Sequence, residues 1–509
     1  MKLISKFGAF HERLKRESIG ATLLSLASDS SVYLAGGILI GLGNIVLVPL
    51  YTRTLSPREF GVYALVDVTV LLLVAVSALK LDVSYLKWFA DLAPARRGEL
   101  LGSTLLTGLG VSLLSGSILS FSVAGRLGEF WLRTSAHSYA WLLCPIVILE
   151  NLQSLLMTDL RARRRPVPYS ASSLLRLVGM VAASYYFLSI RQMGLHGLFL
   201  GRLIGDALAV GYLCAVCLRS AVWKIVPSLT VPMIRFGLPL IWSVFAVMLQ
   251  DASGRYFLSR YGTLEEVGLL GAAIKIGGVF QMLVAQPFGV AWGGVLFQIV
   301  KKRDAQIIYS KILAYVYVLS LGVALVLTIF APTLFRVFTA PAYYPAIALL
   351  PLILLVRAMN VIEQPAATGI YLSGRTGIFA AIYSVALALN LLLLFVLVPR
   401  YGAMGVAWAW LLAWACVPIL DLLVGQRTYR LSFNWKLLFL PILPWAFILP
   451  QLSHILGSWR SAYLAIECAL SGAVVLFSAG LLAYDFRSTR RQAHTSGPVS
   501  AVLEAPKAQ

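Results

Sequence analysis

Charged side chains occur inside long apolar stretches of this sequence, where such residues are uncommon. The basic members of this set are Lys80, Arg176, Arg202, Arg255, Lys275 and Arg357. A charge at the centre of a bilayer costs about 2.5 to 3.5 kcal/mol on insertion scales, so it usually faces a bundle interior or an oppositely charged partner. These residues are therefore our first candidates for contact with a charged substrate.

Most of the basic residues also have a purely structural explanation, and these explanations differ. Lys80 and Arg357 lie near the ends of the expected helices, where a long side chain can extend to the lipid headgroups. Arg176 has no acidic neighbour on its own helix. We therefore expect Arg176 to be the unpaired cation of the set.

Two further basic residues have an acid one helical turn away. Arg255 follows Asp251 by four residues, and Arg202 precedes Asp206 by four. Residues at this spacing lie on the same face of a helix and can form an ion pair. The sequence thus leaves two readings open for Arg202 and Arg255, substrate contact or pairing within the helix.

Carboxylates within the apolar stretches are candidates for binding and releasing an ion. The residues proposed for this role are Glu150, Asp206, Asp251, Asp67 and Glu363. A buried carboxylate can bind and release H⁺ or coordinate Na⁺. Glu150 lies near the middle of its helix and is our preferred choice, although an ion pair with Arg176 on the neighbouring helix would explain it as well.

Composition indicates that the elements carrying these charges are membrane helices. The 509 residues are 59% hydrophobic and 12% charged, whereas soluble domains are about 25% charged. Apolar stretches of about 20 residues recur along the chain, each long enough to cross a bilayer as a helix. Because a lipid-facing backbone must satisfy its own hydrogen bonds, we expect an all-α membrane protein.

The hydropathy pattern predicts fourteen transmembrane helices. Their expected ranges are 28–50, 60–83, 98–123, 137–158, 168–190, 194–218, 236–258, 267–297, 309–331, 343–362, 376–398, 402–424, 435–452 and 459–484. The eighth range is too long for one straight crossing and contains Pro287, which favours a kink or an interfacial extension there.

The distribution of Lys and Arg predicts how the chain is oriented. The formal net charge is +21, but the basic residues concentrate in alternate loops, for example in Arg161 and residues 163–165. This is the pattern of the positive-inside rule, and it places both termini in the cytoplasm with an even number of crossings. It argues for membrane topology rather than nucleic-acid binding.

The spacing of apolar stretches also suggests how the chain is divided. We expect a basic cytoplasmic segment at 1–27, a six-helix half at 28–218, a cytoplasmic connection at 219–235, a second six-helix half at 236–424, two additional helices at 435–484 and a disordered cytoplasmic tail at 485–509. Residues 1–18 have apolar and basic positions at helical spacing, so they read either as an interfacial helix or as a disordered tail.

Short motifs recur at a nearly constant offset in the two expected halves. Arg53, Glu59 and Gly61 have the same mutual spacing as Arg260, Glu266 and Gly268, and the glycine pair 194 and 197 matches the pair 402 and 405. Since each six-helix half would begin on the same side of the membrane, the halves should be parallel repeats, as in alternating-access transporters. Chance glycines in tight loops are the alternative reading.

Several segments resemble a known family. Residues 48–63 read VPLYTRTLSPREFGVY, residues 236–240 read FGLPL, residues 255–258 read RYFL, and Trp292 follows Ala291. These motifs resemble the polysaccharide biosynthesis proteins, which include the O-antigen and exopolysaccharide flippases of the multidrug/oligosaccharidyl-lipid/polysaccharide exporter superfamily. One departure is Gly254, where relatives often carry an acid.

The resemblance implies a function, a substrate and a location. It implies that the chain flips an undecaprenyl-diphosphate-linked oligosaccharide from the inner to the outer leaflet of a bacterial inner membrane, driven by H⁺ or Na⁺. The six basic residues would then contact the diphosphate, since arginine and lysine suit phosphate oxygens. Membrane lipids, a polysaccharide polymerase and chain-length machinery are the implied partners.

Other functions have less support from the sequence. A drug or cation antiporter of the related multidrug group would share the fold, and a membrane glycosyltransferase or polymerase would handle the same lipid. Paired carboxylates on the expected outer side occur only at Glu265 and Glu266, which read as charges favoured at a helix start. The five cysteines fall in apolar stretches and the histidines are scattered, so we expect no metal, no cofactor and no catalytic residue.

Overall fold

The computed structural model describes residues 45–125, 137–300, 304–373, 375, 377–427, 429, 431, 440–445 and 470–483. The expected interfacial segment at 1–18, the tail at 485–509, and most of the first and thirteenth predicted helices lie outside the described residues. Within the described part every regular element is helical, which confirms the all-α prediction.

Nine helical segments of the described chain are long and apolar enough to cross a bilayer, so the chain is a multi-pass membrane protein. This number does not test the predicted fourteen, because several predicted helices lie wholly or partly outside the described residues. One of the nine, α16 (Gly377–Gly425), has 49 residues and is interrupted at Gly402, where φ is 52° and ψ is −131°. It therefore comprises two helices, with the boundary where the sequence predicted it.

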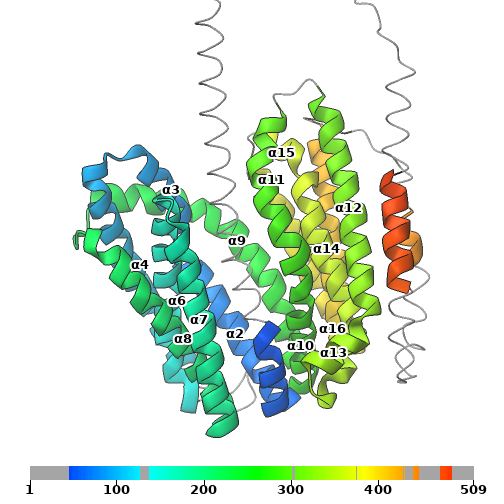
Figure 1. Ribbon diagram of the computed structural model, residues 1–509, viewed down its shortest axis with the longest axis horizontal. Helices are drawn as coiled ribbons and strands as arrows, with labels where there is room; N and C mark the ends of the chain where they lie inside the picture. Colours follow the sequence, from blue (N-terminus) through cyan, green and yellow to red (C-terminus); the bar gives the residue numbers. More distant parts are fainter. Residues whose placement is uncertain are drawn as a thin grey trace, which may run out of the picture.

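The helices form two groups with α9 (Pro227–Tyr261) running between them (Figure 1). The first group contains α2 (Pro57–Ser77), α3 (Leu81–Asp91), α4 (Arg97–Ala124), α6 (His137–Ala162), α7 (Pro166–Tyr185) and α8 (Gly194–Cys217). The second contains α10 (Leu264–Phe280), α11 (Gln286–Ile299), α12 (Ala305–Ile329), α13 (Ala331–Phe338), α14 (Leu350–Ala366), α15 (Thr368–Ser373) and α16.

Helix α9 contacts both groups. Near its start, the main-chain oxygen of Met233 accepts a hydrogen bond of 3.0 Å from Ser84 on α3. Further along, the main-chain oxygen of Gln250 accepts one of 3.1 Å from the Trp410 indole on α16. The helix begins nine residues before its predicted start at 236, because the segment from Pro227 packs on the first group.

The end of the second predicted helix differs from expectation. We predicted one helix over 60–83, but α2 ends at Ser77 and α3 begins at Leu81. Leu79 and Lys80 between them have φ values of 47° and 51°, a left-handed conformation that is strained for residues with a Cβ. Because Gly237 has no side chain, the α9 backbone comes close to the carbonyl group of Leu79 at this break.

The kink predicted in the eighth helix is present as an interruption of regular α-helix. Residues Gln281–Ala285 form a π-helical turn between α10 and α11, and Pro287 follows as the second residue of α11. Proline has no N–H, and its ring displaces the carbonyl four residues earlier, so a wider turn just before it relieves the conflict.

The repeated motifs have the same local structure at both of their positions. Ser56 and Glu59 form a capping box at the start of α2, and Thr263 and Glu266 form one at the start of α10. Glu59 lies beside Gly194 (φ +54°), and Glu266 lies beside Gly402 (φ +52°). The two sequence matches thus describe one contact that occurs twice, although the proposed division into two halves stays a prediction.

Helices α2 and α10 cross closely where the repeat places a glycine on each. A Cβ built on Gly61 would meet the main chain of α10 at Leu264, and one built on Gly268 would meet the main chain of α2 at Pro57. Small residues that let two backbones touch are typical of membrane helix pairs. Tyr343 adds to this contact by donating a hydrogen bond of 2.9 Å to the main-chain oxygen of Leu55.

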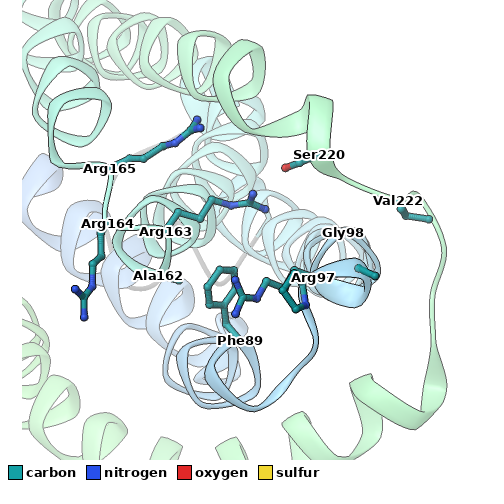
Figure 2. A pocket seen from close by; sticks show the side chains of 11 residues that line it. Phe89, Arg97, Gly98, Ala162, Arg163, Arg164, Arg165, Ser220 and Val222 are labelled. Carbon is teal, nitrogen blue, oxygen red and sulfur yellow. The ribbon is translucent and has the colours of Figure 1, made fainter.

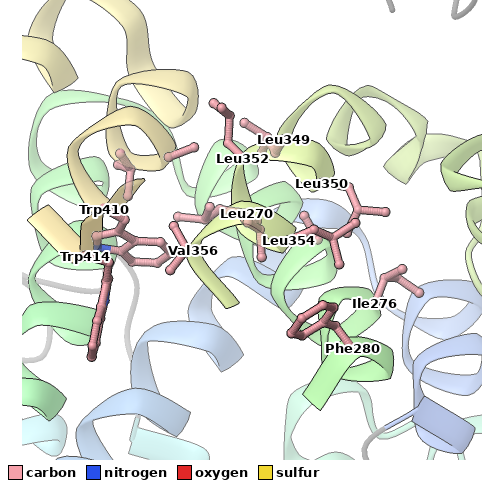
Figure 3. Packing of buried hydrophobic residues seen from close by; sticks show 14 of the residues in the cluster. Leu270, Ile276, Phe280, Leu349, Leu350, Leu352, Leu354, Val356, Trp410 and Trp414 are labelled. Carbon is pink, nitrogen blue, oxygen red and sulfur yellow. The ribbon is translucent and has the colours of Figure 1, made fainter. Parts of the chain in front are cut away.

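The second group has a continuous apolar interior (Figure 3). Side chains of α10, including Leu270 and Phe280, pack with α14 residues such as Leu354 and with Trp410 of α16. These side chains are almost fully buried, with exposures between 0% and 4%. This packing fixes the position of α10, the helix that carries Lys275.

Candidate functional site

Six of the predicted site residues form one cluster, which we call the charge network. Its members are Asp67, Glu150, Arg176, Arg202, Asp206 and Lys275. They come from α2, α6, α7, α8 and α10, so five helices contribute side chains. The network lies where the first group meets α10 of the second.

Arg202 occupies the centre of the charge network. Its Nη1 donates to Oδ1 of Asp67 over 2.7 Å, and its Nη2 donates to Oε1 of Glu150 over 2.7 Å. Only 8% of its side chain is exposed. A guanidinium group can satisfy two carboxylates from different helices because its donors form a fixed fork, so Arg202 ties α8 to α2 and α6.

Arg176 extends the network to a second arginine. Its Nε donates to Oδ1 of Asp206 over 2.6 Å, and its Nη2 donates to Oε1 of Glu150 over 3.0 Å. The close approach of α7 and α8 depends on Gly205, since a Cβ there would lie 2.9 Å from the main-chain oxygen of Arg176. The small residue beside Asp206 thus allows α7 and α8 to pack closely enough for this pair.

Lys275 carries the network from the first group to the second. Its Nζ lies 3.4 Å from Oδ2 of Asp67 and 5.6 Å from the centre of the Tyr63 ring. The lysine side chain is 22% exposed, whereas the Asp67 carboxylate is mostly buried. Lys275 therefore makes a direct electrostatic contact between α10 and α2.

Arg255 lies beside the charge network without joining it. Its Nη1 donates to the main-chain oxygen of Ala64 over 3.3 Å, and its Nε is buried without a hydrogen-bond partner. Asp67, Asp251 and Arg357 all act on its charge electrostatically. Among the described residues, no carboxylate accepts a hydrogen bond from Arg255, so its charge is less compensated than that of Arg202.

The structure corrects two expectations about pairing. Arg176 is not the unpaired cation, because it contacts both Glu150 and Asp206. Arg202 does not pair with Asp206 on its own helix; its partners are Asp67 and Glu150. The predicted pair between Glu150 and Arg176 is confirmed, and the helix-spaced acid Asp206 is taken by Arg176 instead.

The remaining predicted residues lie outside the network. Lys80 occupies the break between α2 and α3, and Arg357 lies on α14. Neither forms an ion pair with a described residue. Glu363 also lies on α14, where it accepts a hydrogen bond of 3.0 Å from the hydroxyl group of Tyr383.

Glu363, a predicted ion-coupling residue, belongs to a second polar cluster whose other acid, Asp421, was not among the predicted site residues. Asp421 of α16 is fully buried, and neither of its carboxylate oxygens has a hydrogen-bond partner. It interacts electrostatically with Glu363. The sequence shows Asp421 as an acid inside an apolar helix. The residues around it in the chain do not show that it would lie beside Glu363.

The packing around Gly254 explains why this chain has no acidic side chain just before Arg255. A Cβ at this position would lie 2.5 Å from Cγ1 of Val406 and 2.7 Å from Cζ2 of Trp410. Helices α9 and α16 are therefore packed too closely here for any side chain. Asp67 of the charge network and Asp251, one turn earlier on the same helix, are the acids that act electrostatically on Arg255 in this protein.

The charges of this region do not cancel completely. Three carboxylates and three cations compensate one another within the charge network, whereas Arg255 and Arg357 add two positive charges next to it and Asp251 adds one negative charge. In the described ranges no group of histidine, cysteine or acidic side chains has the arrangement of a metal site, and the four described cysteines are free. The region is suited to attract an anionic group rather than a cation.

Comparison with known proteins places the chain in a family. The family model described as "Polysaccharide biosynthesis protein" matches residues 26–300, which is more than half of the 509 residues. Sequence comparison with curated proteins finds no match.

Solved structures show the same fold at low sequence identity. The lipid II flippase MurJ in an inward closed conformation has a TM-score of 0.69 at 14% identity, over 91% of this chain and 99% of that one. An inward-facing multidrug resistance transporter of the MATE family has a TM-score of 0.61 at 15% identity, over 78% and 94%. The MATE multidrug transporter DinF-BH has a TM-score of 0.60 at 18% identity, over 80% and 96%.

Proposed function

The chain belongs to the polysaccharide biosynthesis protein family, and from this we propose that it flips an undecaprenyl-diphosphate-linked oligosaccharide across a bacterial inner membrane. It is a helical membrane transporter of that family, with the fold shared by flippases and multidrug exporters. The cargo would be a repeat unit of O-antigen, capsule or exopolysaccharide, carried from the inner to the outer leaflet. The protein would act by transport, not as an enzyme.

The observation that carries the proposal is the positive charge at the meeting point of the two helix groups, which nearby acids compensate only at a distance. Arg255 has no carboxylate hydrogen-bond partner among the described residues and has an unsatisfied Nε. Arg357 adds a second positive charge that acts on it. A diphosphate would relieve this repulsion and accept hydrogen bonds from the guanidinium groups.

The same observation argues against a cation or drug antiporter. A site for a cationic substrate should offer carboxylates without basic partners at the entry of the ligand. At the meeting point of the two groups, the three carboxylates of the charge network are each held by an arginine. The acids without a basic partner, Glu363 and Asp421, lie within the second group. The similarity to multidrug transporters therefore supports the fold but not their type of substrate.

Transport would proceed by alternating access. The two groups touch where α2 and α10 cross, through the glycine contact and the bond from Tyr343 to Leu55. By the predicted topology this crossing lies toward the outer face. Opening there would separate Lys275 from Asp67, while the bonds from Arg202 to Asp67 and Glu150 lie within one group and can persist.

The ion that drives transport would bind in the second group. We favour Glu363 and Asp421 over Glu150, because both oxygens of Asp421 lack partners and Glu150 is already bound by Arg176 and Arg202. Paired buried carboxylates without a basic partner can take up H⁺ or Na⁺. The proposal includes both termini in the cytoplasm, and a polymerase and chain-length proteins as partners.

The proposal can be tested with purified protein in proteoliposomes that contain a fluorescent undecaprenyl-diphosphate oligosaccharide. Dithionite bleaches only outward-facing label, so flipping appears as a larger accessible fraction under an imposed H⁺ or Na⁺ gradient. Arg255→Gln should reduce the flipping rate at least tenfold, as expected for loss of a charge-assisted hydrogen bond of about 1.5 to 3 kcal/mol. Arg235→Gln, an exposed arginine on the same helix, is the matched control.

Two outcomes would contradict the proposal. One is a flipping rate equal to that of protein-free vesicles under both gradients. The other is transport of a cationic dye such as ethidium by protein that leaves the lipid-linked sugar in place. Equal rates for Arg255→Gln and Arg235→Gln would remove Arg255 from the substrate path.

A further inference from the structure

A second concentration of arginines lies far from the charge network, in a cavity of about 570 Å³. We call it the basic pocket, lined by Phe89, Arg97, Gly98, Arg163, Arg165 and Val222 among others (Figure 2). It forms where the end of α3, the start of α4, the turn between α6 and α7, and residues 220–222 meet. Asp159 beside it follows Glu150 of the charge network by nine residues of α6, about 14 Å along the helix.

Two guanidinium groups of the basic pocket share one aromatic ring. The Arg97 guanidinium lies 4.3 Å from the centre of the Phe89 ring, and that of Arg163 lies 5.9 Å from it. Figure 2 shows the Arg97 side chain lying across Phe89, with the Arg163 side chain passing nearby. Nε of Arg97 and Nη2 of Arg163 are buried without hydrogen-bond partners, so the fold leaves donor capacity here unused.

The positive charge of the basic pocket is only partly compensated. Arg163 is held by Asp159, with Nε 2.8 Å from the carboxylate, and Tyr85 donates to the same carboxylate over 2.5 Å. In the part of the chain that the structure describes, Arg97 and Arg165 form no ion pair. Cations held this close together repel one another unless an anion lies between them.

The segment that closes one side of the basic pocket has the character of a membrane interface. Val222, Trp223 and Ile225 are 48%, 58% and 54% exposed. Tryptophan is enriched at the level of the lipid headgroups. The N–H of Val222 donates to the main-chain oxygen of Gly98 over 2.9 Å, which fixes this apolar segment beside the arginines.

We propose that the basic pocket binds the phosphate group of an anionic phospholipid headgroup. The arginines would donate to the phosphate oxygens, for which their planar fork is suited, while the acyl chains would lie along the exposed apolar segment that contains Trp223. The site is separate from the proposed substrate path, and on the predicted topology it faces the cytoplasmic leaflet. A bound lipid would fix the ends of α3, α4 and α6 relative to one another.

The test uses the full chain in detergent, with dioctanoyl-phosphatidylglycerol as the probe and thermophoresis or native mass spectrometry as the readout. Arg97→Gln combined with Arg165→Gln should weaken binding about tenfold or more, because charge-assisted hydrogen bonds to the phosphate are lost. Neither substitution leaves a described carboxylate without its partner. Arg96→Gln is the matched control, since Arg96 is half-exposed and pairs with Glu99 at 3.2 Å.

Each result of this experiment decides the proposal. Weaker binding in the double variant, with Arg96→Gln within about twofold of the parent protein, supports it. Equal binding in all three proteins overturns it. Inorganic phosphate that displaces the lipid at a similar concentration would make the pocket a site for free phosphate, and the lipid assignment would then be wrong. Gel-filtration profiles show whether the variants are folded.

Discussion

Lys275 contacts Asp67 across the boundary between the two helix groups, with 3.4 Å between Nζ and Oδ2. The other oxygen of the same carboxylate accepts a hydrogen bond of 2.7 Å from Arg202 within the first group. Asp67 therefore serves two interactions of different kinds, one inside a group and one between groups. A relative movement of the groups can break the second and keep the first.

This difference predicts unequal effects on stability. Lys275→Gln leaves Asp67 bound to Arg202, so the free energy of unfolding should fall by no more than about 1 kcal/mol. Asp67→Asn removes a carboxylate from a buried arginine and should lower it by about 3 kcal/mol or more. Thermal unfolding in detergent, followed by a thiol-reactive dye, measures both, and equal loss in the two variants would contradict the assignment.

Arg176 and Asp206 should show strong coupling in a double-mutant cycle. Arg176→Ala leaves the fully buried Asp206 without its partner at 2.6 Å, so this variant should be destabilised by about 3 kcal/mol. Adding Asp206→Asn should restore between about 0.5 and 3 kcal/mol, because the unpaired charge is removed. The readout is unfolding in detergent, and additive losses would show that the two side chains do not interact.

Glu363 and Asp421 should affect ion coupling rather than folding. Glu363→Gln and Asp421→Asn remove charges that no basic side chain of the described residues compensates, so unfolding temperatures should stay equal or rise. Flipping in proteoliposomes should no longer respond to the H⁺ or Na⁺ gradient.

Tyr383→Phe provides the control for these two variants. It removes only the hydrogen bond to Glu363 and should keep the response to the gradient. A full response in both carboxylate variants would place the coupling site elsewhere.

Adding even one methyl group at the crossing of α2 and α10 should destabilise the protein. Gly61→Ala would place a Cβ against the main chain of Leu264, and overpacking of this kind destabilises by about 1 to 3 kcal/mol. Gly278→Ala on α10 is the control, because nothing lies within 4 Å of its Cβ position, and alanine there should stabilise by roughly 0.5 to 1 kcal/mol. Shifts of opposite sign in the unfolding temperature are expected, and a neutral Gly61→Ala would contradict the close contact.

Features that depend on near neighbours in the chain could be predicted from the sequence. Apolar length identified the membrane helices, and the hydropathy pattern placed a boundary between two of them at Gly402, where the structure has a positive φ of 52°. Glu265 and Glu266 were recognised as charges at a helix start, where Glu266 now completes a capping box. The break at Leu79 and Lys80 was missed because neither residue type usually ends a helix. The backbone conformation of the break depends on its contact with α9.

The sequence by itself determined which charges lie within the membrane helices, since that follows from composition along a single segment. Only the tertiary structure decided their partners. Arg202 and Asp206 are one turn apart, yet each pairs with a side chain of another helix. In a low-dielectric interior each charge needs short, well-directed hydrogen bonds, and it was the packing of α2, α6, α7 and α8, not the spacing along one helix, that supplied them.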